Sequence, residues 1–303
     1  MVDRFSDEDL VTSLRVLIDA DLILLSRASV EYESTHPIED VSVSVGADLL
    51  ELVCKYSSPG VDPVTGHNRG VTYEAEIYRS AFPDVDLATP AFYGTFGLVD
   101  SIDCIVLQHV SGFRVQRAPE PRSLLDVCAD LGRFHSRVVG ILPPVHNVFS
   151  RSHFSRLTSE MELLPGVSAR LRGAGSTVVD VLSNDPRTLI HGELYPANVL
   201  INEEGPVVID WECAGVGPGV LDLAMLTQGS WDPDLVDECE EVYWRERRNV
   251  TAGVGRRILA AGRIMAAGLL LLHLRGQETD GVQEGIALET IGAQASRLRG
   301  ELA

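Results

Sequence analysis

The chain has 303 residues, a formal net charge of −19 at pH 7 and a hydrophobic content of 45%. This length suits two domains that share one interface, and the composition is ordinary for a globular protein. The strong negative charge argues against a nucleic acid or an anionic membrane as the main partner. It permits a cationic ligand without proving one.

The five cysteines are dispersed, odd in number and without CxxC spacing. We therefore expect reduced thiols rather than a disulfide or zinc framework. The acidic, polar start does not resemble a signal peptide, and the longest apolar run, residues 264–272, is too short to cross a bilayer. These features predict a cytoplasmic protein and say nothing of its oligomeric state.

Lysine and arginine together number 25, and Lys55 is the only lysine. It stands near the end of the apolar segment 49–56, which we expect to be a strand. A lone lysine among arginines suggests a site that needs a compact charge on a flexible stem. Chance in an arginine-rich composition explains it equally well.

The first third of the chain predicts an antiparallel sheet with helices. Ser6 and Asp9 have the spacing of a helix start. The expected strands are 29–34, 41–45, 49–56, 92–99 and 103–110, with a loop at 57–70 and a helix at 72–82 that carries Glu74 and Glu76.

Beyond residue 111 the apolar periodicity becomes helical. The expected helices are 122–139, 234–248, 256–274 and 285–298. The fold class is therefore α+β, with a small β-rich lobe at residues 1–108 and a larger helical lobe at residues 109–303. A cleft between lobes is the expected ligand site.

The most informative stretch is residues 189–226, which contains a polar loop, a hairpin of two short apolar strands, and a glycine-rich turn that leads into a helix. If Gly205 closes a three-residue loop, Asn198 and Asp210 lie opposite each other on neighbouring strands. Apolar residues surround both, so the two polar side chains need partners. Their hard oxygen atoms suit Mg²⁺ that carries a nucleotide phosphate. Glu193 adds a second carboxylate nearby.

The motif HGELYPANVL, followed by VVIDWE and GPGVLDLA, resembles the aminoglycoside phosphotransferase and choline-kinase group, which shares the protein-kinase-like fold. His191, Gly192, Asn198, Asp210 and Asp222 match the family pattern. The resemblance implies a two-lobed fold with a nucleotide-binding N-terminal lobe, and it implies ATP and Mg²⁺ as cofactors.

The resemblance also implies roles for residues outside the hairpin. Lys55 would bind the α- and β-phosphates and pair with a helix glutamate, for which we favour Glu74 over Glu76. The segment from Gln108 to Val110 would be the hinge that holds adenine, although a plain strand end fits that segment equally well.

Within the hairpin, the resemblance implies that Asp210 and Asn198 hold the metal. Glu193 stands where the family has its catalytic aspartate, and it would orient the acceptor hydroxyl and take its proton. We expect His191 to hold the loop by hydrogen bonds rather than to react, and Asp222 to support it from the following helix. The family often lacks a glycine-rich phosphate loop, as this chain does.

The leading hypothesis is an ATP-dependent kinase that acts on a hydroxyl of a small, possibly cationic molecule, such as an aminoglycoside-like antibiotic, a sugar or an amino alcohol. An alternative is a kinase-like protein that binds a nucleotide or metabolite without transfer. A protein kinase is disfavoured, because the short segment between Asp210 and Asp222 leaves no room for an activation loop. The sequence names neither the acceptor nor the choice between ATP and GTP.

Overall fold

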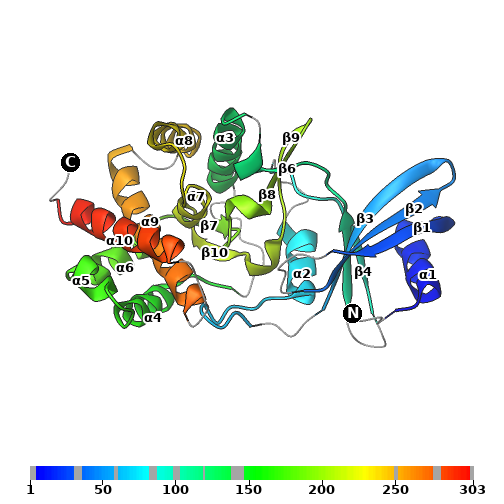
Figure 1. The fold of residues 1–303 in the computed structure, drawn as a ribbon, viewed down its shortest axis with the longest axis horizontal. Coiled ribbons are helices and arrows are strands. Elements are labelled where there is room, and N and C mark those ends of the chain that lie inside the picture. Colours follow the sequence, from blue (N-terminus) through cyan, green and yellow to red (C-terminus); the bar gives the residue numbers. More distant parts are fainter. Residues whose placement is uncertain are drawn as a thin grey trace.

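The computed structural model describes residues 5–30, 36–57, 61–81, 87–97, 103–118, 120–137, 147–248, 252–275 and 281–300. The chain is an α+β protein with the predicted two lobes. A small lobe built on an antiparallel sheet lies at one end, and a larger helical lobe lies at the other (Figure 1). The boundary between residues 108 and 109 stays a prediction.

The N-terminal lobe contains a five-stranded antiparallel sheet with the strand order β1-β2-β3-β5-β4. Its elements are α1 (Asp7–Ile18), β1 (Leu22–Ser29), β2 (Ile38–Val45), β3 (Asp48–Tyr56), α2 (Val71–Ala81), β4 (Phe92–Phe96) and β5 (Cys104–Gln108). The predicted start of α1 is confirmed, since Ser6 and Asp9 form a reciprocal capping box. The strand expected at 29–34 lies mostly outside the described residues. The observed strand β1 ends at Ser29, the first residue of that expected strand.

The two faces of β3 serve different purposes, because successive side chains on a strand point to opposite sides. Leu52, Cys54 and Tyr56 pack in a cluster with α1. Lys55 therefore faces the other side, where α2 packs beside β5 and the 3₁₀ turn Trp211–Cys213. This alternation places the lone lysine toward the helical lobe.

Two small sheets belong to the larger lobe. β6 (Phe113–Arg114), β8 (Val199–Asn202) and β9 (Gly205–Val208) form one sheet, and β7 (Arg187–Ile190) pairs with β10 (Gly215–Pro218) in the other. Short 3₁₀ turns accompany them, namely η1 (Val115–Arg117), η2 (Pro196–Asn198) and η3 (Trp211–Cys213).

The rest of the larger lobe is helical. The helices are α3 (Arg122–Arg137), α4 (Arg151–Glu162), α5 (Val167–Leu171), α6 (Gly175–Asn184), α7 (Val220–Leu226), α8 (Pro233–Glu246), α9 (Ala252–Leu274) and α10 (Val282–Leu298). The four long helices that the sequence predicts are all present, whereas α4, α5 and α6 were not predicted.

Helix α9 is the centre of this lobe and packs against α4, α6, α7 and α10. The sequence analysis considered only residues 264–272, which are too few to cross a bilayer. The whole stretch Val254–Leu274 is long and apolar enough to do so. The most apolar window is 72% buried inside the protein, as expected of a core helix. All five cysteines are free thiols, as predicted, and all five are buried.

The hairpin register differs from the prediction by one residue. Asn202 pairs with Gly205, so the turn has two residues rather than three, and Val199 pairs with Val208. Asn198 therefore lies opposite Ile209, whose backbone N–H donates to its carbonyl at 3.0 Å. The prediction that Asn198 faces Asp210 across the strands is wrong, because the turn closes one residue earlier than assumed.

Candidate active site

Lys55 lies at the centre of a buried ion network between the lobes. Its Nζ lies 2.8 Å from Glu74 Oε2, 2.5 Å from Asp210 Oδ1 and 2.8 Å from Glu212 Oε2. The lysine comes from β3, Glu74 from the first turn of α2, and the other two carboxylates from the segment after β9. The helix glutamate that pairs with Lys55 is thus Glu74, while Glu76 is exposed on the same helix.

The charges in this network stabilise one another. Burial alone would lower the pKa of Lys55, but Asp210, Glu74 and Glu212 outweigh it and raise that pKa well above its usual range. Burial raises the pKa of Glu74, and the attraction of Lys55 does not fully offset it. Lys55 therefore keeps its positive charge although the residue is only 5% exposed.

Asp210 has a left-handed backbone, with φ 68° and ψ 62°. A non-glycine residue seldom adopts this conformation, and such residues are concentrated at functional sites. The turn directs the carboxylate away from the hairpin and toward Lys55. Its side chain is 38% exposed, whereas those of Glu74 and Glu212 are buried. Asp210 is thus the member of the network that reaches the open side.

The oxygen donors near this opening fit Mg²⁺. Glu74, Asp210 and Glu212 have carboxylate oxygens within 4.8 Å of one another, but Lys55 Nζ already contacts all three. Asn198 donates its side-chain N–H to the carbonyl of Glu193 at 2.9 Å, which leaves the amide oxygen to bind a cation. A carboxylate and an amide oxygen are ligands that Mg²⁺ accepts.

Asp222 of α7 binds the backbone of the loop that carries His191 and Glu193. The fully buried carboxylate of Asp222 accepts the backbone N–H of His191 at 2.7 Å and that of Gly192 at 3.0 Å. Gly192 has φ 83°, and a Cβ there would clash with the carbonyl oxygen of Cys213. Only glycine fits this close approach.

His191 uses both ring nitrogens within the fold. Its Nε2 bonds to the carbonyl of Ile209 at 2.9 Å, and its Nδ1 lies 3.3 Å from the backbone nitrogen of Glu193. The side chain is buried. These contacts support the expectation that His191 holds the loop, and Asp222 supports it as predicted.

Glu193 lies 3.1 Å from Arg69, a residue that the sequence analysis did not select. The side chain of Glu193 is 18% exposed. Burial raises the pKa of Glu193, and the guanidinium of Arg69 opposes this without cancelling it. Arg69 also contacts Glu212 through Nε at 2.5 Å. It therefore joins the Lys55 network to Glu193.

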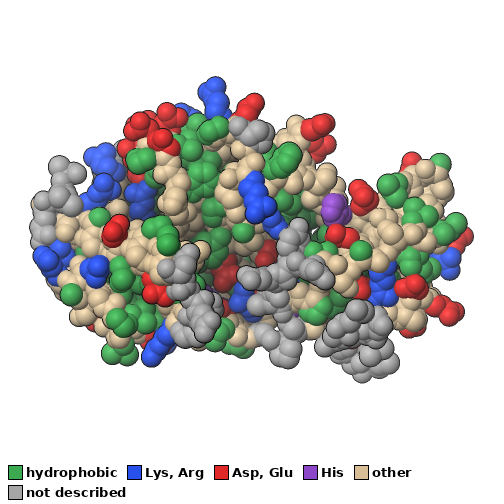
Figure 2. All heavy atoms as spheres, in the orientation of Figure 1, with side chains coloured by type: hydrophobic (Ala, Val, Ile, Leu, Met, Phe, Trp, Pro, Cys, Tyr) green, Lys and Arg blue, Asp and Glu red, His purple; other side chains and the backbone are tan. Residues whose placement is uncertain are grey.

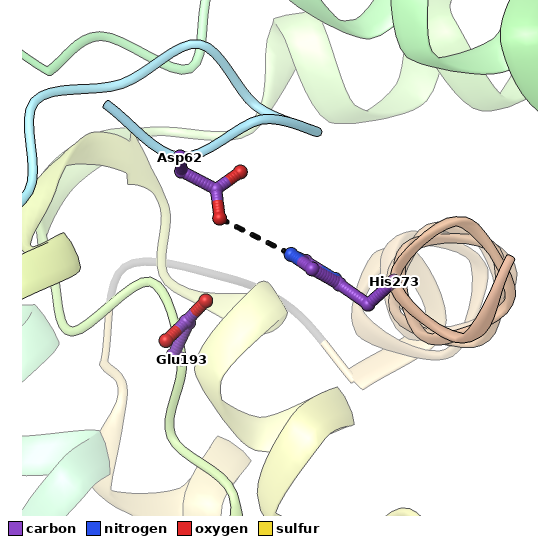
Figure 3. Close-up of side chains that lie close together, drawn as sticks. All are labelled: Asp62, Glu193 and His273. Carbon is purple, nitrogen blue, oxygen red and sulfur yellow. Dashed lines mark hydrogen bonds and ion pairs between the residues drawn. The ribbon is translucent and has the colours of Figure 1, made fainter. Parts of the chain in front are cut away.

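A second unpredicted group surrounds Glu193. Asp62, from the loop before α2, and His273, from α9, lie near its carboxylate, and Asp62 Oδ2 is 3.2 Å from His273 Nε2 (Figure 3). Nothing in their sequence context marks either residue. Only the packing of α9 against the remaining helices brings His273 to this position.

The predicted hinge residues line an open cavity of about 800 Å³. Gln108, at the end of β5, and Val110 form one wall, and Ile201 and Val207 of the hairpin contribute apolar surface. The backbone N–H of Gln108 is bonded to the carbonyl of Ala91. A planar apolar ring with polar edges would suit this cavity. Figure 2 shows a hollow between the lobes, with acidic side chains inside it.

Comparisons with known proteins support this interpretation of the fold. Residues 114–259 match the model of the phosphotransferase enzyme family. No curated protein sequence matches the chain.

Solved structures match over almost the whole chain. A microcompartment-associated aminopropanol kinase has a TM-score of 0.62 at 17% identity, covering 96% of this chain and 97% of that one. The choline kinase LicA from Streptococcus pneumoniae has a TM-score of 0.62 at 12% identity, with coverage of 96% and 99%. An aminoglycoside 2'-phosphotransferase-IIIa in its GDP complex has a TM-score of 0.61 at 15% identity, also with coverage of 96% and 99%.

At these identities the solved structures show the protein-kinase-like fold, and the family model covers the segment that holds the hairpin, Glu193 and Asp222. Residues 114–259, just under half of the chain, are thus similar to the phosphotransferase enzyme family, and the whole chain has the fold of the solved aminoglycoside phosphotransferase and choline kinase structures.

Proposed function

We propose that the protein transfers the γ-phosphoryl group of Mg-ATP to a hydroxyl group of a small molecule. The observation that carries this proposal is the contact of Lys55 Nζ with both Glu74 and Asp210. In phosphoryl transfer of this kind, a lysine–glutamate pair beside a metal-binding aspartate positions the phosphates. The three groups come from β3, α2 and the hairpin, so their meeting depends on the whole fold.

Each remaining group has a place in the reaction. Lys55 would neutralise the α- and β-phosphates, and Asp210 with Asn198 would hold Mg²⁺, which supplies charge neutralisation at the phosphates. The cavity at Gln108 and Val110 would hold the adenine. Residues 1–108 would form the nucleotide-binding lobe and residues 109–303 the catalytic and acceptor lobe.

Glu193 would orient the acceptor hydroxyl and accept its proton. The acceptor oxygen then forms a bond to the γ-phosphorus while the bond to the β–γ bridging oxygen breaks, and ADP leaves with that electron pair. Catalysis consists mostly of positioning and charge stabilisation, which the preformed ion network supports. His191 and Asp222 would act only by holding the loop.

The candidate acceptors are aminoglycoside-like antibiotics, sugars and amino alcohols. Structural neighbours include an ethanolamine kinase, a choline kinase and a fructosamine-3-kinase by their names. Two solved neighbour structures hold nucleotides, GDP in one and AMP in the other. These relatives support a screen that begins with amine-bearing alcohols and compares ATP with GTP.

Acceptor-dependent ADP release tests the proposal. Wild-type protein with Mg-ATP should release ADP faster when one of the acceptors is present, and Asp210→Asn should remove this increase. A second candidate function is nucleotide binding without transfer, because Glu193 replaces the family's aspartate and is engaged by Arg69. Nucleotide binding with no acceptor effect in any class would favour that candidate.

A further inference from the structure

The segment 61–70 links β3 and α2, both in the small lobe, and contacts the larger lobe on the way. We call it the 61–70 loop. The side chain of Asn147 bonds to both backbone polar groups of Asn68, at 2.7 and 2.8 Å. Arg156 of α4 donates to the carbonyls of Val64 and Thr65, at 3.0 and 2.7 Å. The loop is therefore docked against the helical lobe beside Glu193.

Arg69 stands at the end of this loop and spreads its guanidinium over three carboxylates. Nη2 lies 3.1 Å from Glu193, Nε lies 2.5 Å from Glu212, and Nη1 lies 3.3 Å from Asp62. The side chain is only 18% exposed. Because a guanidinium is planar with donors in a fixed fork, three simultaneous contacts define its position closely.

Asp62 fixes the other end of this arrangement. Its Oδ1 accepts from Val64 N at 3.0 Å, from Thr65 N at 2.5 Å and from Thr65 Oγ1 at 2.7 Å. Its Oδ2 faces Arg69 and His273. The carboxylate has little capacity left for a ligand, since Oδ1 accepts three hydrogen bonds and Oδ2 contacts two cationic side chains.

The three groups in Figure 3 could suggest a metal site, since Asp62, Glu193 and His273 have ligand atoms within 4.8 Å of one another. The hydrogen bonds of His273 argue against it. Nδ1 lies 2.9 Å from the carbonyl of Leu269, and Nε2 lies 3.2 Å from Asp62. Both partners are acceptors, so both ring nitrogens carry protons and neither offers a lone pair to a metal. Arg69 and the doubly protonated His273 supply the positive charge at this point.

We propose that Arg69 is the positioning residue that allows a glutamate to serve at position 193, an inference that rests on the proposed function. Glutamate is one methylene longer than the family's aspartate and has one more rotatable bond. Misplacement of a reacting group by about 1 Å can cost about a hundredfold in rate. The guanidinium of Arg69 removes this freedom by holding Oε2 from the side of the 61–70 loop.

Arg69 also links Glu193 to the phosphate-binding side of the site. Glu212 accepts from Arg69 through Oε1 and contacts Lys55 through Oε2. Glu74, Lys55, Glu212, Arg69 and Glu193 thus form a continuous series of ion pairs. The position of the candidate base is thereby fixed relative to that of the phosphate-binding lysine.

A double-mutant cycle tests this role. Arg69→Gln should lower kcat for phosphoryl transfer about a hundredfold, with a much smaller change in the dissociation constant of Mg-ADP. Arg69→Lys should recover part of the loss, because it restores a charge without the fork. Glu193→Asp should lower transfer in the wild-type background and cost far less in the Arg69→Gln background, because the contact it withdraws from is already gone.

Arg156→Gln is the matched control. It removes an arginine that docks the same loop but does not contact Glu193, so it should leave the cost of Glu193→Asp unchanged. Melting temperatures of all variants show whether they fold, and if Arg69→Gln does not fold, the cycle with Arg69→Lys decides. If the effects of the Arg69 and Glu193 substitutions on transfer are fully additive, the positioning role of Arg69 is overturned while the proposed function stands. A wild-type protein that transfers phosphate to no acceptor overturns the proposed function, and the positioning role with it.

Discussion

Asp210 Oδ1 lies 2.5 Å from Lys55 Nζ, although 155 positions separate the two residues in the chain. The lysine belongs to the sheet of the small lobe and the aspartate to the hairpin of the larger lobe. Because this contact joins the lobes at the opening of the cleft, it orients the predicted phosphate-binding charge toward the predicted metal ligand.

Replacement of Lys55 should affect folding as well as nucleotide binding. In Lys55→Met the buried carboxylates of Glu74 and Glu212 lose their shared cation. Breaking a buried ion pair on one side costs about 3–5 kcal/mol, so we expect a loss of about 3 kcal/mol in the free energy of unfolding, measured by urea denaturation. The exposed pair of Arg245 and Glu246 provides the control, since Arg245→Met should cost less than about 1 kcal/mol. Equal stability of the two variants would contradict the buried network.

Asp210→Asn should separate magnesium binding from nucleotide binding. Mg-ADP at about 100 times its dissociation constant should stabilise the wild-type protein by about 2.7 kcal/mol. The variant should lose the magnesium-dependent part of this stabilisation, because an amide is a weaker ligand than a carboxylate for a hard cation. Thermal shifts with and without EDTA measure both parts. A variant that keeps the full magnesium response would exclude Asp210 as a ligand.

Asp222→Ala should destabilise the protein through the loop that holds His191 and Gly192. Both backbone N–H groups lose their acceptor, and each orphaned buried donor costs about 1–3 kcal/mol. We expect a loss of at least about 2 kcal/mol in the free energy of unfolding. Asp180→Ala removes an acid from an exposed pair with Arg151 and should cost about 0–1 kcal/mol. A stable Asp222→Ala variant that is only catalytically impaired would refute the structural role.

The Asp62–His273 pair should make stability depend on pH. Burial would lower the pKa of His273, but Asp62 and Glu193 outweigh it and raise that pKa. The pair therefore stabilises the fold fully below the unfolded pKa of His, about 6.5, and loses this effect as the pH rises through the raised value. Burial would raise the pKa of Asp62, but hydrogen bonds from His273 and Thr65 outweigh it and lower that pKa. The pair therefore loses its stabilising effect at acid pH only when the pH falls through this lowered pKa, below the usual range of an aspartate.

A comparison of two histidine variants measures this effect. The stability difference between wild type and His273→Gln should be largest near pH 5–6 and should shrink at alkaline pH. For His153→Gln the difference in stability should change with pH in the opposite direction. Burial lowers the pKa of His153 to about 3, so His153 destabilises the wild-type fold increasingly as the pH falls below about 6.5. A pH-independent difference for His273→Gln would show that the pair carries no charge.

The sequence predicted the parts of the site that lie in one continuous motif or that alternate regularly along a strand. His191, Gly192 and Asp222 act together as expected, and Lys55 pairs with Glu74, the helix glutamate that the family resemblance favoured. The hairpin register was predicted wrongly, because Asn202 pairs with Gly205 and a change of one residue in the turn moves every partner.

Arg69 and His273 could not be predicted, because their contacts are long-range. Arg69 meets Glu193 across 124 positions, and His273 meets Asp62 across 211. Neither residue stands in a motif. Their positions depend on how the 61–70 loop docks and how α9 packs, and local propensity determines neither. The burial of Lys55 is likewise a property of the closed interface between the lobes.

Transfer of the γ-phosphoryl group from Mg-ATP to an acceptor tests the central claim most directly, with the acceptor analysed by mass spectrometry. The panel covers antibiotics, sugars and amino alcohols, and wild type is compared with Glu193→Gln at matched nucleotide occupancy. We expect a phosphorylated product from at least one acceptor with wild type, and a loss of about 10²–10⁴-fold in its rate with the variant, as for removal of a general base. Saturating Mg-ATP binding without a phosphorylated product from any acceptor would contradict the assignment as a kinase.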